Sequence, residues 1–217
     1  SPPLVPAGER DEYPASAAQR WMYVLSRLDR NGTTWNMPGA FRIDGPLDAE
    51  RLREAARMAV ERHDVFRTRF EWRDDGPVQV LDRNAAFEMP VSRANGEDVE
   101  RLLRDRVRPF DIGRAPLIRL ELIELSETSR LLFVDAHHLV FDGASIGPFL
   151  RELADAYAGK PLPPPALHYR DFAVWERSRL TEERLETLDR FWTKELEGDI
   201  PSLDLQTDYP RRRSGSG

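Results

Sequence analysis

The sequence predicts an α+β fold built around a central antiparallel hairpin. The strongest strand candidates, residues 117–125 and 131–138, are separated only by Ser126-Glu-Thr-Ser129, a spacing typical of a hairpin. Several segments before and after this hairpin carry apolar residues at helical spacing instead. Hydrophobic residues make up 40% of the 217 positions, which is enough to form the core of one large domain or two small ones.

The first elements are predicted from caps and alternation. Residues 1–12 are rich in proline and polar residues and are expected to be a linker. An amphipathic helix over 16–29 follows, because Ser16 and Gln19 have the spacing of a capping box. A short strand around Phe41 and Ile43 precedes a Gly-Pro turn. The apolar face expected for the first helix is Trp21, Met22, Leu25 and Leu28.

The middle of the chain is predicted to contain two more helices and a hairpin. Asp48 caps a helix that closes near residue 62, and its apolar face is expected at Leu52, Ala55, Ala56 and Ala59. Residues 65–72 alternate between apolar and polar side chains, which predicts a strand that pairs back with residues 78–80. A third helix is expected from about residue 97 to residue 108, where Pro109 ends it.

The last third is predicted to be helical. A helix capped by Ser145 should run to Tyr157, and a proline-rich spacer follows at 161–165. Two further helices are expected, over 169–178 and over 181–197. We expect Trp21, Trp175 and Trp192 to lie in the core.

Composition excludes several classes of function. A net charge of −6 argues against a nucleic-acid surface, because phosphate binding needs a basic field. No apolar run approaches the roughly 20 residues of a membrane helix, and no signal peptide is visible. Cysteine is absent, which rules out disulfides. We therefore expect a cytoplasmic protein, and the excess of arginine over lysine suggests a bacterial source with GC-rich DNA.

The candidate chemistry lies where the second strand of the hairpin ends. The apolar residues 131–134 lead to His137 and His138, which are followed by Asp142 and Gly143. If the strand extends through His138, the two imidazoles point to opposite faces, because strand side chains alternate. One histidine then faces a cavity. A metal site is not expected, because adjacent strand residues diverge and no third ligand has a recognisable spacing.

Four blocks of sequence stand out along the chain. The blocks are Ser16-Ala-Ala-Gln-Arg-Trp21, Arg62-His-Asp-Val-Phe-Arg-Thr-Arg-Phe70, His137-His-Leu-Val-Phe-Asp-Gly143 and Tyr169-Arg-Asp-Phe-Ala-Val-Trp175. In this order they resemble the signatures of the N-terminal lobe of a nonribosomal peptide synthetase condensation domain, and the third block is the HHxxxDG signature intact.

The resemblance implies a single chloramphenicol-acetyltransferase-like lobe, an α/β sandwich whose mixed, largely antiparallel sheet is flanked by helices. This lobe would span 13–200. Residues 201–217 would form the crossover toward a C-terminal lobe, which has no counterpart in this sequence, and a tail. An active-site tunnel that runs between two lobes is then incomplete, so the resemblance implies that this chain alone is inactive.

The resemblance also implies a reaction. An acyltransferase of this family forms an amide bond between a donor thioester and an acceptor amine, both carried on the 4'-phosphopantetheine of peptidyl carrier proteins, and works beside an adenylation domain. No cofactor would be bound directly. Histidine, with an unperturbed pKa near 6.5, suits proton removal near pH 7.

The family pattern assigns roles to individual residues. His138 would act as base or position the amine, which the resemblance leaves open, and His137 would support it. Gly143 would offer its backbone N–H to the thioester carbonyl. Asp142 would pair with Arg62 or, alternatively, Arg67, and removal of one partner of such a buried pair costs roughly 3–5 kcal/mol.

Two other functions remain open from the sequence. An epimerization domain also carries HHxxxDG, although it needs residues from the missing lobe. A non-catalytic module that docks carrier proteins is the alternative from a different class. His63 and His168 are expected to be packing or surface histidines.

Overall fold

The computed structural model describes residues 3–29, 32–94, 98–200 and 208, and it divides into a compact unit over 1–179 and a second unit over 180–217. The predicted lobe, 13–200, includes parts of both units, and its bounds stay a prediction. The helix α6 (Glu182–Glu195), in the second unit, buries none of its side chains. Apart from Asp208, the expected crossover and tail lie outside the described residues.

The core of the first unit is a four-stranded sheet with the order β2-β7-β6-β5. The predicted central hairpin is confirmed, because β6 and β7 pair antiparallel with Leu120 opposite Val134. Only β5 joins the sheet in a parallel arrangement. The strands are β2 (Gly39–Asp44), β5 (Val91–Arg93), β6 (Ile118–Glu124) and β7 (Ser129–Ala136).

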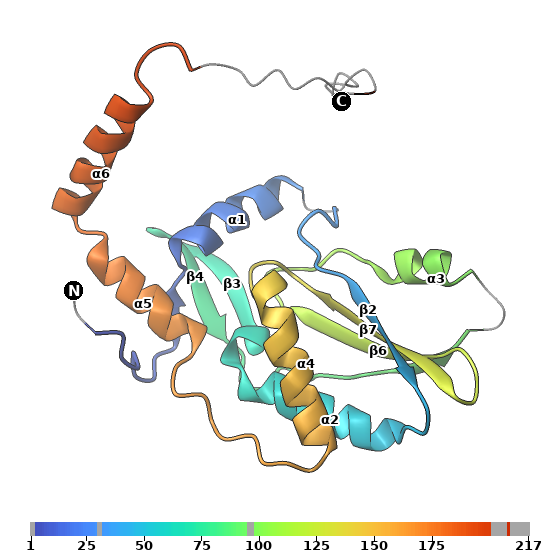
Figure 1. Ribbon diagram of the computed structural model, residues 1–217. Coiled ribbons are helices and arrows are strands. Elements are labelled where there is room, and N and C mark those ends of the chain that lie inside the picture. The colour runs from blue at the N-terminus through green and yellow to red at the C-terminus, as the bar shows by residue number, and fades with distance from the viewer. Residues whose placement is uncertain (1–2, 30–31, 95–97, 201–207, 209–217) are drawn as a thin grey trace. The chain divides into compact units, whose positions relative to one another are not determined.

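Helices cover both faces of this sheet, which confirms the α/β sandwich. The helices α2 (Ala49–Arg62) and α4 (Gly143–Tyr157) lie side by side over one face in Figure 1. The main core cluster joins their apolar side chains to alternate residues of β7, such as Leu132 and Val134. On the opposite face, Phe133 packs with Leu102 of α3 (Val99–Arg106). The expected start of α3 at Glu97 lies outside the described residues.

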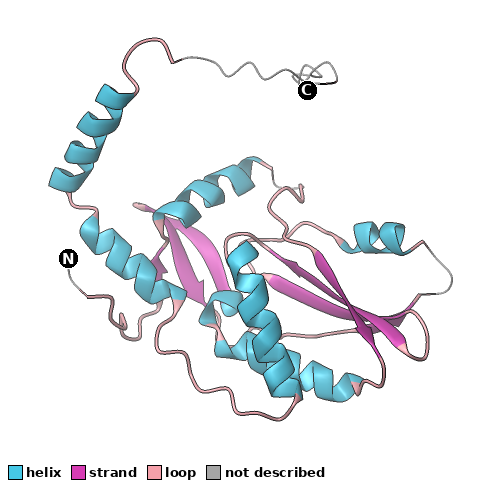
Figure 2. Ribbon diagram, in the orientation of Figure 1, coloured by secondary structure: helices cyan, strands magenta, loops and turns pink. Residues whose placement is uncertain are grey.

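A second, three-stranded sheet has the order β1-β4-β3 and is visible beside the first in Figure 2. The predicted hairpin is confirmed in β3 (Thr68–Arg73) and β4 (Gly76–Leu81). The strand predicted from residue 65 starts later, because Asp64–Arg67 form a 3-10 helix, η1. The edge strand β1 (Glu12–Pro14) was not predicted, since three residues are too few to show an alternating pattern.

The start of the first helix is as predicted, but its buried face is not. Ser16 and Gln19 form the capping box of α1 (Ala17–Leu28). Its buried residues are Gln19, Tyr23 and Ser26, whereas Trp21 is 67% exposed and Leu28 80% exposed. The apolar pattern failed here because the inner face of α1 contacts polar groups, including the Leu139 carbonyl, to which Gln19 donates at 3.1 Å.

Two other predictions near the ends of the first unit need correction. Residues 1–12 are not a free linker throughout, since the Ala7 N–H donates to Asp171 at 2.9 Å and β1 begins at Glu12. The helix α5 (Tyr169–Arg179) forms as predicted, but its Trp175 is only half-buried. In the second unit, Trp192 is 56% exposed rather than in a core. Over the described residues, no helix is long and apolar enough to cross a membrane.

Candidate active site

The two histidines occupy a tight turn rather than the end of a strand. β7 ends at Ala136, His137 continues only as an isolated bridge to Asn36, and the Val140 N–H closes the turn on the His137 carbonyl at 2.9 Å. The His138 N–H donates to the Trp35 carbonyl at 2.8 Å. The predicted strand through His138 is therefore wrong, although the two rings still line different cavities.

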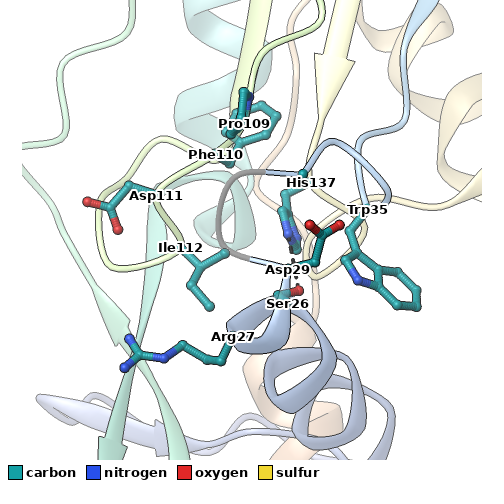
Figure 3. Close-up of a pocket in the computed structure, with 10 residues that line it drawn as sticks. Ser26, Arg27, Asp29, Trp35, Pro109, Phe110, Asp111, Ile112 and His137 are labelled. Carbon is teal, nitrogen blue, oxygen red and sulfur yellow. Dashed lines mark hydrogen bonds between the residues drawn. The ribbon is translucent and has the colours of Figure 1, made fainter. Parts of the chain in front are cut away.

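His137 is held inside the protein by both ring nitrogens. It is 4% exposed, and Figure 3 shows its ring above Ser26, between Phe110 and Trp35. Its Nδ1 accepts the Leu139 N–H at 3.1 Å, so the proton of the neutral ring is on Nε2, which lies 3.4 Å from Ser26 Oγ. Burial, and then the nearby His138, lower the pKa of His137 to about 4. His137 is thus neutral at pH 7 and has no free lone pair.

His138 faces a separate cavity of about 250 Å³ and is only half-buried. Its Nδ1 is shielded from solvent and has no hydrogen-bond partner in the part of the chain that the structure describes. The ring lies 6.3 Å from that of Trp35. His138 lines the cavity, so a group bound there lies against an imidazole, a side chain able to accept or position a proton.

All four sequence blocks meet at this cavity. The His138 turn supplies one wall, Gln19 comes from the first block, Val65 from the second and Tyr169 from the fourth. Sequence reasoning did not assign Gln19, Met22, Ser145 or Tyr169 to the site. Gln19 and Tyr169 lie inside the quoted signature blocks, and Met22 directly follows the first block. Their position in the sequence could therefore have indicated these three residues. The lining residues are Ala18, Gln19, Met22, Val65, His138, Leu139, Val140, Phe141, Asp142, Ser145 and Tyr169.

Asp142 caps the helix α4, a role that the sequence assigned to Ser145. Its Oδ1 accepts the Ser145 N–H at 2.8 Å and the Ser145 hydroxyl at 2.6 Å, and the Asp142 N–H donates to the Ser145 hydroxyl oxygen at 3.3 Å. The hydrogen bond from Ser145 is the main reason that the pKa of Asp142 lies below its usual range. Asp142 is exposed, so this carboxylate stays ionised and shapes the start of the helix.

The predicted pairing of Asp142 with an arginine is wrong. Arg62 Nε lies 3.6 Å from Glu152 of α4, and Arg67 Nη2 lies 3.0 Å from Asp64. Both carboxylates are less exposed than Asp142. Water screens the attraction between opposite charges less at such shielded sites, so these carboxylates attract the guanidinium groups more strongly.

The same cluster anchors α5 beside the cavity. Asp64 is buried and also pairs with Arg170, while its Oδ2 lies 3.4 Å from His168 Nδ1. Tyr169, between these two partners, extends its hydroxyl to within 3.0 Å of Ser16 Oγ. His63 contacts Glu152 at 2.6 Å, so neither His63 nor His168 lines the candidate cavity.

Gly143 is the first residue of α4, next to the cavity. A Cβ atom there would contact nothing within 4 Å, so glycine is not required for packing. The first N–H groups of a helix have no partner within the helix and carry partial positive charge. The nearby residues Asp142 and Ser145 line the cavity, whereas Gly143 itself is not among the lining residues.

A sequence model of the family described as Condensation domain matches residues 9–216. The chain belongs to this family. It is 41% identical over 208 residues to surfactin synthase subunit 2 of Bacillus subtilis (strain 168) and 37% identical over 208 residues to gramicidin S synthase 2 of Brevibacillus brevis. Both matches cover 96% of this chain but only 6% and 5% of the relatives, so the chain corresponds to a small part of such synthetases.

Solved structures confirm the fold of the lobe. The complex of the X-domain and OxyB from teicoplanin biosynthesis matches with a TM-score of 0.84 and 30% identity, over 97% of this chain and 49% of that chain. The starter condensation domain of rhizomide synthetase matches with a TM-score of 0.75 at 18% identity, over 87% of this chain and 48% of that chain. The predicted chloramphenicol-acetyltransferase-like lobe is therefore confirmed, and the chain spans about half of each solved domain.

Proposed function

We propose that this condensation-domain lobe forms the HHxxxDG half of a site that joins a carrier-bound acyl thioester to a carrier-bound amine. The observation that carries the proposal is the meeting of all four sequence blocks around the His138 cavity. The half-buried ring of His138 lines this cavity, which supports a role for the ring in handling the amine. Asp142 has no part in proton transfer, because its carboxylate is occupied by the helix cap.

The chemistry requires a deprotonated amine to attack the thioester carbonyl. His138 removes a proton from the amine or holds it in line for attack, and the thiol of the donor arm leaves as the amide forms. The oxyanion that develops on the carbonyl oxygen is stabilised by a donor such as the Gly143 N–H. His137 supports His138 from the other side of the turn and is not itself a base, since its Nδ1 is occupied.

The proposed substrates arrive on carrier proteins, each on a 4'-phosphopantetheine arm, so the lobe itself needs no bound cofactor. Its partners are donor and acceptor carrier domains, an adenylation domain that loads the acceptor and a second lobe that completes the tunnel. The chain matches only about half of each solved domain, which supports the expectation that the isolated 217 residues do not condense.

The test uses the full synthetase that contains this lobe, with loaded donor and acceptor carriers. His138→Ala is expected to lower the rate of amide formation by roughly 10²–10⁴-fold, the usual contribution of a general base. His63→Gln is the matched control, because His63 contacts Glu152 and does not line the cavity. Full turnover by the His138→Ala enzyme would reject the proposed role.

A second candidate, a recruiting domain without condensation activity, is favoured by one comparison. The X-domain from teicoplanin biosynthesis, which is 30% identical to this chain, was solved in complex with OxyB. A recruiting role predicts that the synthetase retains product formation when His138 is replaced but loses it when a surface of the lobe is altered. The same His138→Ala assay therefore separates the two candidates.

A further inference from the structure

A buried carboxylate lies directly behind the histidine turn. Asp135 of β7 is 0% exposed. Its Oδ2 accepts Asn36 Nδ2 at 2.7 Å and lies 3.5 Å from Arg119 Nη1, while its Oδ1 is buried with no hydrogen-bond partner among the residues that the structure describes. Asn36 Nδ2 also donates to the Arg108 carbonyl at 2.9 Å. A carboxylate in such a place is costly, since burial disfavours its charge.

The first contact of Asp135 leads to the backbone of both histidines. Asn36 forms an antiparallel bridge with His137, and the preceding residue, Trp35, accepts the His138 N–H at 2.8 Å. The side chain of Asn36 is therefore fixed by Asp135 while its backbone is paired with the turn. A shift of Asn36 would move the backbone groups that set the direction of the His138 ring.

The second contact leads to the ring of His137. Arg119 donates to the carbonyls of Arg108 and Pro109, each at 2.7 Å, and its guanidinium lies 3.7 Å from the centre of the Phe110 ring. The Phe110 ring in turn packs edge-on against His137, with centroids 6.1 Å apart. Figure 3 shows Pro109 and Phe110 above the His137 ring.

We propose that Asp135 is a positioning residue that holds the His137-His138 turn through Asn36 on one side and Arg119 on the other. It touches no substrate. Its function is to fix the direction in which His138 enters the cavity, so the inference rests on the proposed condensation reaction. The charge on Asp135 is unfavourable for folding, because burial raises its pKa to about 6 against the influence of Asn36 and Arg119. The Asp135 carboxylate therefore favours the rate of amide formation while its charge disfavours the stability of the fold.

The test uses two substitutions and two measurements. Asp135→Leu removes both contacts with little change of volume, and Asp135→Asn keeps an acceptor for Asn36 but removes the charge near Arg119. Asp155→Asn, which alters an exposed carboxylate of α4 that pairs with Lys160, is the control. Thermal unfolding and imidazole ¹⁵N shifts are measured on the 217-residue chain, which contains four histidines. The rate of amide formation is measured in the full synthetase.

We expect Asp135→Asn to unfold at the wild-type temperature or above, and Asp135→Leu to unfold below it because Arg119 loses its carboxylate partner. The His137 and His138 imidazole resonances should shift in both variants. The kcat should fall by about 10–100-fold in Asp135→Leu and less in Asp135→Asn, because a small misplacement of a reacting group is costly. A merely structural role would make activity follow stability. Wild-type imidazole resonances in both folded variants would overturn the proposal, whatever the His138→Ala assay shows about the reaction.

Discussion

The two sides of the histidine turn are chemically opposite although they are made by adjacent residues of the same type. On one side, His137 is 4% exposed, and both of its nitrogens lie near protein groups. On the other side, His138 is half-buried beside a cavity of about 250 Å³, and its Nδ1 is uncommitted. The difference shows that the tertiary environment gives two identical neighbouring side chains different roles, because one ring is enclosed by protein groups and the other lines a cavity.

The largest expected difference between the two sides is in stability. His137→Ala should lower the free energy of unfolding by roughly 2–4 kcal/mol, because it leaves a cavity and strands the Leu139 N–H without its acceptor. His138→Ala should cost less than about 1 kcal/mol, because that ring is half-buried and its Nδ1 has no hydrogen-bond partner among the described residues. Denaturant unfolding of the two variants measures both losses of free energy. Equal losses would contradict the predicted difference between the two histidines.

The second expected difference is in the dependence of stability on pH. Unfolded His137 binds a proton near its ordinary pKa of 6.5, whereas the folded side chain does so only near 4. Above 6.5 both states are neutral and the residue has no effect on the pH dependence. Between 6.5 and 4 only the unfolded state gains the proton, so folding loses about 3 kcal/mol as the pH falls.

This loss is measured against His137→Asn, which retains an acceptor for the Leu139 N–H but does not titrate. The difference in unfolding free energy between the wild type and this variant cancels the contributions of other groups, such as Asp135. We expect the wild type to lose stability relative to the variant as the pH is lowered from 7.5 to 4. Parallel curves would show that His137 is not held neutral.

A smaller effect tests the cavity side of the turn. Gly143→Pro removes one backbone N–H, but proline is well tolerated at the first position of a helix, so α4 should remain intact. If that N–H stabilises the oxyanion, the rate of amide formation in the full synthetase falls by about 10-fold. Gly143→Ala keeps the N–H and meets no neighbouring atom, so it should retain the rate. Equal rates in both variants would remove Gly143 from the mechanism.

The smallest expected effect concerns Asp142. Its replacement by alanine should cost about 1 kcal/mol, the usual loss for a helix N-cap. Loss of a buried ion pair would cost roughly 3–5 kcal/mol instead. Thermal or denaturant unfolding of Asp142→Ala distinguishes these values, and a loss in the higher range would show that an arginine contacts this carboxylate.

Much of the fold was predictable because it depends on local patterns. The capping box at Ser16, the cap at Asp48 and the short spacing between the two strand candidates of the β6–β7 hairpin all gave elements that the structure confirms. The buried face of α1 was not predictable from apolar spacing. Gln19 and Ser26 are buried there because they satisfy polar groups of the histidine turn, which is distant in sequence.

The sequence by itself determined that an HHxxxDG turn follows a buried strand and that three other blocks belong with it. Only the tertiary structure decided which charges meet. Asp142 was expected to take an arginine, but Arg67 and Arg170 pair with Asp64. Ion pairs depend on distance and on burial from solvent, and both quantities arise only when segments far apart in the chain are packed together.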